Sequence, residues 1–215
     1  MKANTKQAKF WLGSFAEPYL KRNLFDPKQL DADYVTAYGM TRTRLNTEFL
    51  KSVPKDARIL EVGANAGNIL MSLQTMGYRN LYGIELNPDI VQVARHRAHG
   101  INIIQGDALD VPFKDGFFDL VLTSNVLIHI APTTIKKALK EIGRCSKRYV
   151  WGFEYYAPTY TEIRYRGNKS VLWKTDFPAL YLSVFGKKMT LTKKKFIPWR
   201  SDPKLIDCMF LLKKR

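Results

Sequence analysis

The sequence predicts an α/β fold, with a doubly wound and mostly parallel sheet covered by helices on both faces. Two observations predict it. Short apolar runs of four to six residues recur between positions 58 and 153, and segments with helical periodicity separate several of them. Glycines and helix caps mark the ends of these segments. Such alternation is typical of parallel strands joined by crossover helices.

The elements follow in order along the chain. Residues 1–57 are expected to be a helical cap, which Pro18 and Pro27 break into short pieces. Residues 58–215 are expected to form one ligand-binding domain, with a substrate loop region at about 154–204. The expected parallel strands are Arg58–Val62, Leu81–Ile84, Ile101–Ile104, Phe118–Thr123 and Tyr149–Phe153. The expected helices are 68–76, 88–98 and one that opens at Thr133 or Thr134. The tail, Leu205–Leu212, is the candidate for a last, antiparallel strand.

The composition indicates a globular protein, because 46% of the 215 residues are apolar and 25% are charged. The two cysteines, Cys145 and Cys208, cannot form a disulfide framework or a four-cysteine zinc site. We expect no bound metal. No apolar run reaches the ~18 residues of a membrane span, and the stretch Met1–Gln7 is polar. A cytoplasmic location is therefore expected.

The net charge of +16 is unevenly distributed. Residues 61–150 hold 10 basic and 8 acidic side chains, whereas 151–215 hold 14 and 5. Basic flanks attract nucleic acid, a membrane surface or a small anionic substrate. Because the flanks would cover the acceptor site, a small carboxylated or phosphorylated acceptor is favoured first and nucleic acid second. The lysines at 187, 188 and 193–195 are expected to form a solvated loop.

Ligands of such sheets bind at the carboxyl ends of the strands. The first strand runs into Glu61–Asn68, which lacks both the G-x-G-x-x-G pattern and the phosphate loop G-x-x-x-x-G-K-[ST]. The ligand part that lies close to this loop is therefore not a phosphate. Glu85, 22 residues after Gly63, can accept from both hydroxyls of a ribose. Asp107 follows the third strand and can read an adenine edge. Together these residues indicate an adenosine carried without a phosphate.

These motifs resemble those of class I S-adenosylmethionine-dependent methyltransferases. The resemblance covers Glu61–Gly67, Glu85, Asp107–Ala108 and Ser124–Ile130, although Asn65 replaces a usual glycine. It implies a Rossmann-like fold, S-adenosyl-L-methionine as cofactor and a methyltransferase activity (EC 2.1.1 class). The glycine loop would lie against the methionine part. The implied cofactor-binding residues of the sheet edge are Glu61, Gly63, Ala64, Asn65, Gly67, Glu85, Leu86, Asp107, Ala108, Ser124 and Asn125.

The segment after the fourth strand bears on the methyl acceptor. It has neither the [DNS]-P-P-[YF] motif of base-amine methyltransferases nor a Pro-Cys nucleophile motif. Several segments resemble the methylases associated with pseudaminic acid biosynthesis: Phe10–Gly13, Tyr19–Asn23, Val126–Ile130, Glu154–Pro158 and Glu162–Gly167. That resemblance implies carbohydrate biosynthesis. The acceptor would be a sugar or nucleotide sugar of a nonulosonic acid or surface-glycan pathway.

Candidate catalytic residues follow the fourth and fifth strands. His129 is the leading general base, because an imidazole titrates near pH 6.5, and a packed histidine is the alternative. Glu154 is expected to position the acceptor or to act as the base. Tyr155 can close the pocket, and Tyr156 can stack on a sugar. Arg164 and Arg166 can offer guanidinium groups to an anion, or they can belong to a surface hairpin.

The N-terminal cap offers further candidates for cofactor binding. Trp11, Tyr19 and Arg22 can form a lid over the cofactor, and Arg22 or Arg44 can hold its methionine carboxylate. Packing within the cap is the alternative. Two other functions remain open: an RNA or tRNA methyltransferase, motivated by the charge, and a non-catalytic cofactor-binding protein. The oligomeric state is left open.

Overall fold

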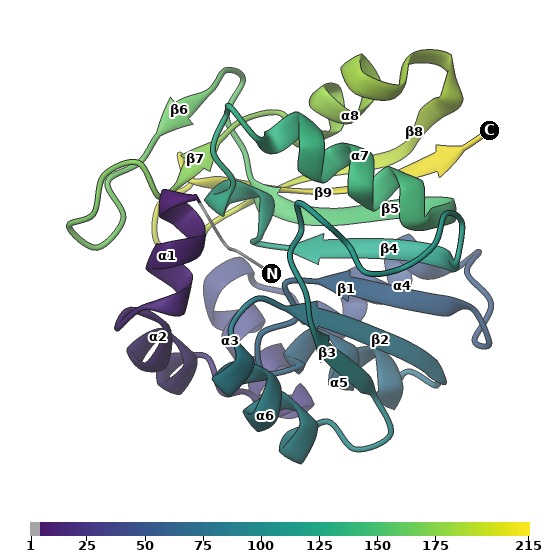
Figure 1. Ribbon diagram of the computed structural model, residues 1–215, viewed down its shortest axis with the longest axis horizontal. Coiled ribbons are helices and arrows are strands. Elements are labelled where there is room, and N and C mark those ends of the chain that lie inside the picture. Colours follow the sequence, from purple (N-terminus) through teal and green to yellow (C-terminus); the bar gives the residue numbers. More distant parts are fainter. Residues whose placement is uncertain (1–4) are drawn as a thin grey trace.

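The computed structural model describes residues 5–215 (Figure 1). Its centre is a seven-stranded sheet in the order β3-β2-β1-β4-β5-β9-β8. The strands are β1 (Arg58–Val62), β2 (Asn80–Glu85), β3 (Asn102–Gln105), β4 (Phe118–Ser124), β5 (Ser146–Tyr155), β8 (Met189–Pro198) and β9 (Ile206–Lys214). Two short strands, β6 (Thr161–Glu162) and β7 (Trp173–Lys174), form a separate pair.

Helices cover both faces of the sheet (Figure 1). They are α1 (Lys6–Leu12), α2 (Ala16–Arg22), α3 (Pro27–Tyr38), α4 (Arg42–Leu50), α5 (Asn68–Thr75), α6 (Pro88–Arg97), α7 (Ile135–Cys145) and α8 (Phe177–Phe185). One apolar core joins α3 to α6 to one face, and a second joins α7 and α8 to the other. Short 3-10 turns lie at η1 (Leu127–His129) and η2 (Gly186–Lys188). Between residues 5 and 215, no helix combines the length and apolar character needed to cross a membrane.

The strand directions confirm the predicted doubly wound architecture. Strands β3, β2, β1, β4 and β5 pair in parallel, and β9 pairs antiparallel with both β5 and β8. The antiparallel C-terminal strand is thus confirmed as β9. The carboxyl ends of the parallel strands meet at one edge of the sheet, which is where the first residue of β9 also lies. Helices α1 to α4 precede β1 in the chain.

Lys193 to Lys195 do not form a solvated loop, so the expectation was wrong for them, whereas Lys187 and Lys188 lie exposed in η2. Lys193 to Lys195 lie in β8, the edge strand beside β9. Glu48 pairs with Lys193 and Lys195 at 3.0 and 2.6 Å, and Asp176 pairs with Lys194 at 2.7 Å. All three lysines are partly buried. Lysines on an edge strand also discourage pairing with another chain.

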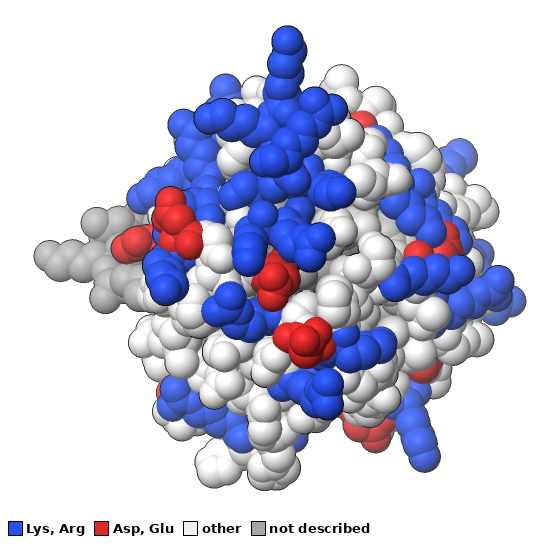
Figure 2. Space-filling model, turned by 90° about the vertical axis from the view of Figure 1, so that its right-hand side faces the viewer, with Lys and Arg blue, Asp and Glu red and all other residues white. Residues whose placement is uncertain are grey.

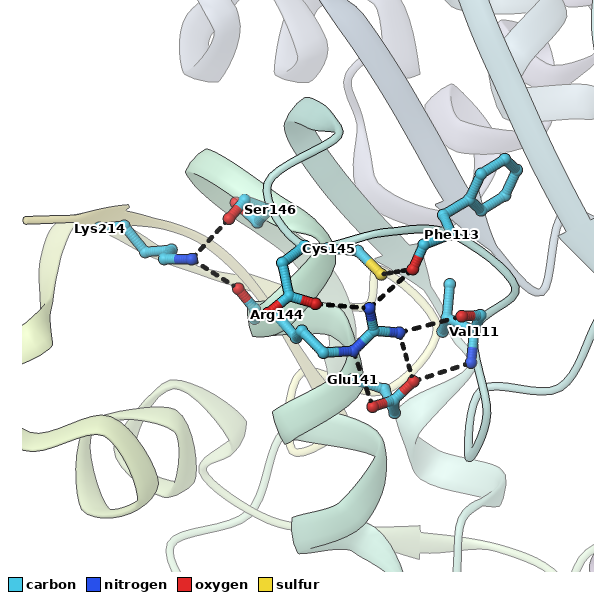
Figure 3. Close-up of polar contacts among 9 residues, drawn as sticks. Val111, Phe113, Glu141, Arg144, Cys145, Ser146 and Lys214 are labelled. Atoms are coloured by element: carbon cyan, nitrogen blue, oxygen red, sulfur yellow. Dashed lines mark hydrogen bonds and ion pairs between the residues drawn. The ribbon is translucent and has the colours of Figure 1, made fainter.

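The far end of β9 is fastened to the end of α7 (Figure 3). Lys214 Nζ donates to the carbonyl oxygens of Gly143 at 2.9 Å and Ser146 at 2.6 Å. A cation at this position also complements the helix dipole. Arg144 pairs with Glu141 and Asp115, and it donates to carbonyls of the loop before β4. Both cations therefore have structural partners.

Candidate active site

A cavity opens at the carboxyl ends of β1, β2 and β4, beneath α1. It encloses about 960 Å³ of empty space, part of which is open to solvent. The structure brings to its wall these residues expected from the sequence: Trp11, Tyr19, Gly63, Asn65, Glu85, Leu86, Asp107, Ala108, Ser124, Asn125 and His129. Segments from four strand ends and the N-terminal cap thus meet around one space.

The loop after β1 has the backbone shape that its sequence requires. A side chain at Gly63 would place its Cβ 2.6 Å from Val126 Cγ2, so glycine permits close approach of the loop after β4. Gly63 also has a φ of +74°. Asn65 has a φ of 47°, in the left-handed region that asparagine tolerates better than most residues. The replacement of a glycine by Asn65 therefore leaves the turn intact.

Glu85 ends β2 and lines the cavity. Its Oε2 accepts from the Asn65 amide at 3.0 Å, and its Oε1 accepts from the Asn87 amide at 2.9 Å. Burial raises the pKa of Glu85, and these backbone amides oppose the rise. Two amides leave lone pairs on each oxygen, because a carboxylate has about four acceptor positions. Those lone pairs can accept from vicinal hydroxyls.

Asp107 lies beside Glu85 in the cavity wall, on the loop after β3. The Gly106 amide donates to the Glu85 carbonyl at 3.0 Å, which ties the two loops together. Asp107 Oδ1 accepts from the Leu109 amide at 2.8 Å. Among residues 5–215, no donor is bonded to Asp107 Oδ2. This oxygen can therefore accept from an exocyclic amine.

His129 also lines the cavity and lies in η1. Its Nδ1 lies 2.8 Å from the Val171 carbonyl oxygen, so Nδ1 carries the proton and donates. Its ring packs against Trp11 at 4.7 Å and Tyr165 at 5.5 Å between centroids. Burial lowers the pKa of His129 to about 4. The imidazole is thus neutral at pH 7, and its Nε2 lone pair is an acceptor.

The neighbouring Ser170 carbonyl accepts from Gln7 Nε2 of α1 at 2.9 Å. Lys6 Nζ donates to the Lys169 carbonyl at 3.3 Å. The segment between β6 and β7 therefore holds α1 over the cavity. Trp11, on α1, also accepts at its carbonyl from Asn87 Nδ2 at 3.1 Å. The structure thus places α1 as a roof of the cavity, whereas α3 and α4 pack on one face of the sheet.

Glu154 does not line the cavity. It is fully buried at the end of β5, where it accepts from the Val126 amide at 3.3 Å. Burial raises the pKa of Glu154 to about 7. Its carboxyl group supports the loop that carries Asn125 and His129. Tyr155, the next residue, packs its ring against Trp199 at 6.1 Å, and burial raises its pKa.

The raised pKa of Glu154 predicts a pH-dependent stability. Between pH 4.5 and about 7 the folded protein holds a proton that the unfolded chain has lost, so this group's contribution to stability falls as pH rises. Glu154→Gln is expected to match wild type at pH 5 and to exceed its unfolding free energy by about 2–3 kcal/mol at pH 8. Urea titrations at both pH values test this. A gap that stays constant with pH would contradict it.

Several expected site residues lie away from the cavity. Arg22, Arg44, Arg164 and Arg166 are exposed, and none lines the cavity wall. Tyr156 packs against Phe196 at 4.5 Å between ring centroids. Glu61 of β1 and Ala64 and Gly67 of the following loop are buried and do not line the cavity wall. Burial raises the pKa of Glu61 to about 8, and its Oε2 is buried with no partner among the described residues.

Arg42 is a buried arginine that the sequence reasoning missed. It is 0% exposed, and its Nη1 donates to Ser124 Oγ of the cavity wall at 3.1 Å. Its guanidinium stacks near the rings of Trp151 and Phe153, and among residues 5–215 its Nη2 is buried without a partner. The signal was present, because the buried positions of α4 are 42, 45, 46, 49 and 50. This helical spacing places Arg42 inward and Arg44 outward.

Asp207 was also missed. It is the second residue of the antiparallel strand β9 and pairs in register with Tyr155 of β5. It is 1% exposed and accepts from Tyr38 Oη and Trp199 Nε1. Burial raises the pKa of Asp207 to about 6, and its Oδ1 is unpaired within the described chain. A lone acid inside the apolar run Leu205–Leu212 was the available signal.

Residues 60–149 match the family model described as a methyltransferase domain. This part of the chain is therefore similar to a methyltransferase domain. The match begins within β1 and ends within β5, so it covers the loops that carry Gly63, Glu85, Asp107 and Asn125. Two solved structures that the chain resembles are described as SAM-dependent methyltransferases of Methanosarcina mazei and as a methyltransferase with bound S-adenosylhomocysteine.

Curated relatives share this domain. A probable phthiotriol/phenolphthiotriol dimycocerosates methyltransferase of Mycobacterium ulcerans is 38% identical over 68 residues, covering 30% of this chain and 26% of that protein. A tRNA (carboxymethyluridine(34)-5-O)-methyltransferase of Xenopus tropicalis is 28% identical over 130 residues, covering 57% and 19%. The chain thus spans about a quarter or less of the length of these two relatives.

A solved structure extends the likeness over most of the chain. It is the Burkholderia thailandensis 1,6-didemethyltoxoflavin-N1-methyltransferase with bound 1,6-didemethyltoxoflavin and S-adenosylhomocysteine. Its TM-score is 0.65 at 15% identity, and the match covers 89% of this chain and 92% of that one. At this identity the likeness establishes a shared fold. The acceptors named for these three proteins differ from one another.

Proposed function

We propose that the protein transfers a methyl group from S-adenosylmethionine to a small anionic acceptor, such as a sugar or nucleotide sugar of a nonulosonic acid or surface-glycan pathway. The observation that carries the proposal is a cavity lined by two chemically different sets of groups. Glu85 and Asp107 offer carboxylate lone pairs to this cavity, and His129 offers a neutral nitrogen. The first set suits an adenosine, and the second suits a hydroxyl or amine.

The residues of the cavity fit the cofactor from its adenosine to its amino acid. Glu85 would accept from the ribose hydroxyls and Asp107 from the adenine amine. The methionine end would lie against the loop of Gly63. There Arg42 donates to Ser124 and carries a buried positive charge with an unpaired Nη2. Within residues 5–215 it has no carboxylate partner at ion-pair distance. A buried positive charge beside the cavity wall favours an anion. Arg42 does not itself line the cavity and contacts the wall through Ser124, and we assign to it the carboxylate role expected of Arg22 or Arg44.

His129 would position the acceptor. When bound, S-adenosylmethionine supplies an activated methyl group with a neutral leaving group. The protein must then hold the acceptor atom about 3–3.5 Å from that methyl group. Nε2 of the neutral imidazole would accept a hydrogen bond from the acceptor hydroxyl or amine. Trp11 and Tyr19 would exclude water from the same space.

Charges near the mouth of the cavity favour an anionic acceptor. Lys6 and Lys9 lie on α1, and Lys169 lies on the segment that holds α1 in place. Arg164 and Arg166 lie on the same segment between β6 and β7, where Arg164 Nε donates to the Gly167 carbonyl at 3.2 Å. Their exposed positions suit attraction of an approaching anion rather than a buried contact.

A substrate screen tests the proposed function. The protein is incubated with S-adenosylmethionine and single sugars, sugar acids or nucleotide sugars, and mass spectrometry detects a gain of one methylene unit. We expect methylation of an acidic or phosphorylated carbohydrate and none of its neutral counterpart. The Glu85→Ala variant is the negative control. Methylation of RNA with no carbohydrate product would contradict the proposed acceptor class.

Removing the imidazole of His129 is expected to lower turnover about fivefold and to leave cofactor affinity unchanged, since one acceptor contact is lost. Steady-state rates on the acceptor found in the screen, together with calorimetry on S-adenosylhomocysteine, measure both quantities for His129→Ala. His96→Ala is the matched control, because His96 is exposed on α6. Unchanged turnover in His129→Ala would remove the role proposed for this residue.

A further inference from the structure

Cations gather at the edge of the sheet opposite the cavity, where the parallel strands begin. Figure 2 faces the end of the molecule at which the C-terminus lies, and Lys and Arg dominate it. We define the basic edge by the cations at or next to these strand ends: Lys55, Arg58, Arg79, Lys147, Arg148, Lys187, Lys188, Lys213 and Arg215. The positive charge outside residues 61–150 therefore does not lie only around the proposed acceptor site.

The basic edge follows the order of the strands. Arg79 precedes β2, Arg58 begins β1, Lys147 lies at the start of β5 and Lys213 near the end of β9. Lys188 precedes β8, and its carbonyl accepts from the Arg215 amide at 3.0 Å. From β2 to β8 there are five strand spacings in the sheet order. At about 4.8 Å each, the row of cations is about 24 Å long.

The cations of the basic edge are not neutralised by the protein. No member of the basic edge forms an ion pair with a residue of the range 5–215. Of the nearby acids, Asp115 already pairs with Arg144, and Asp119 accepts from the Arg58 amide at 2.9 Å. Lys214 and Arg144 are left out of the set, because both have structural partners (Figure 3).

The shape of the row favours a linear polyanion. A nucleic-acid strand in a duplex places one phosphate every ~3.4 Å along its axis, so a row of this length faces about seven phosphates. A membrane surface is less suited, because the basic edge has no large exposed apolar side chain that could insert. In the described chain, such side chains lie elsewhere: Leu12, Leu24, Val35, Tyr160, Phe196 and Leu205.

We infer that the basic edge binds the phosphate backbone of nucleic acid without reading its sequence. The cavity lies at the far ends of β1, β2 and β4. These strands have five to seven residues, so about 17–23 Å separates the two edges at ~3.3 Å per residue. A duplex bound there docks the protein and does not present a base to the cavity. This interaction is independent of the proposed methyl acceptor, and it accounts for exposed charge that the cavity does not use.

Fluorescence anisotropy with a labelled 20-base-pair RNA duplex tests the inference. The variant Lys147→Gln/Lys187→Gln/Lys188→Gln is expected to bind at least tenfold more weakly than wild type. Its slope of log affinity against log salt is expected to be shallower by about 2–3 units. The matched control is Lys28→Gln/Lys136→Gln/Lys204→Gln, which removes the same charge from exposed lysines elsewhere. The control is expected to stay within about twofold of wild type.

Three outcomes would overturn the inference. The first is equal weakening in both variants, because net charge alone would then explain binding. The second is no duplex binding by wild type at about 50 mM salt. The third is co-sedimentation with vesicles of phosphatidylserine and phosphatidylcholine in the absence of duplex binding. Calorimetry is expected to give wild-type affinity for S-adenosylhomocysteine in both variants. That result would show that each variant is folded. It would also separate this test from the test of the methyltransferase proposal.

Discussion

Replacing Glu85 with alanine is expected to weaken the binding of S-adenosylhomocysteine about 30-fold, because hydrogen bonds to a charged group in a buried site contribute about 2 kcal/mol. Glu85 lines the cavity at the end of β2, and its remaining lone pairs can accept from the proposed ribose. Isothermal titration calorimetry measures the change. Glu17→Ala is the control, since Glu17 is exposed and pairs only with Lys21. Wild-type affinity in Glu85→Ala would remove the ribose assignment.

Glu85 also accepts from two loop amides, so its loss can disturb the loop as well as the ligand contact. A ligand comparison separates the two effects. Wild type is expected to prefer adenosine over 2′,3′-dideoxyadenosine, and Glu85→Ala is expected to bind both equally. If the preference persists in the variant, Glu85 supports the loop and another group reads the ribose.

Replacing Arg42 with methionine is expected to weaken S-adenosylhomocysteine binding about 100-fold. The guanidinium is the buried cation next to Ser124, and methionine fills similar apolar space between the rings of Trp151 and Phe153. Arg44→Met is the matched control, because Arg44 lies on the same helix and is exposed. Calorimetry on both variants decides between the two arginines. A loss confined to Arg44→Met would reverse the assignment.

The ligand 5′-methylthioadenosine makes the Arg42 experiment independent of folding, because it lacks the amino-acid part. Arg42→Met is expected to bind this ligand as wild type does. An equal loss for both ligands would mean that Arg42 holds the cavity together rather than binding a carboxylate. In that case the buried bonds of Arg42 to Tyr34 and Asn46 would be its function.

The central strands were predictable from the sequence, because the apolar runs that favour strands locally are also the segments that the fold buries. Gly63 and Glu85 occupy the ends of adjacent strands, and apolar runs such as Phe118–Thr123 are buried on both sides. The chemistry of the cavity follows from these strand ends alone. Parallel strands bring their carboxyl ends to one edge of the sheet. The positions of these residues along the chain were therefore enough to predict that they lie close together.

The errors came from residues whose surroundings are distant in sequence. The sequence predicts that Lys193 to Lys195 are solvated. In the structure their partners Glu48 and Asp176 come from α4 and the cap of α8. Glu154 read as an active-site acid, because nothing local indicates that it turns to the loop after β4. Arg42 is the exception, since the spacing within its own helix indicated its burial.

Two adjacent carbonyls give the cavity a shared support. The Val171 carbonyl fixes the imidazole of His129, and the Ser170 carbonyl fixes Gln7 of the helix above. Entry to the cavity and the orientation of its acceptor-facing nitrogen therefore depend on the same two peptide units. A displacement of this segment that admits a substrate also releases the histidine. Entry of a substrate and orientation of the His129 imidazole are thus coupled. The site is complete only when α1 lies over the cavity.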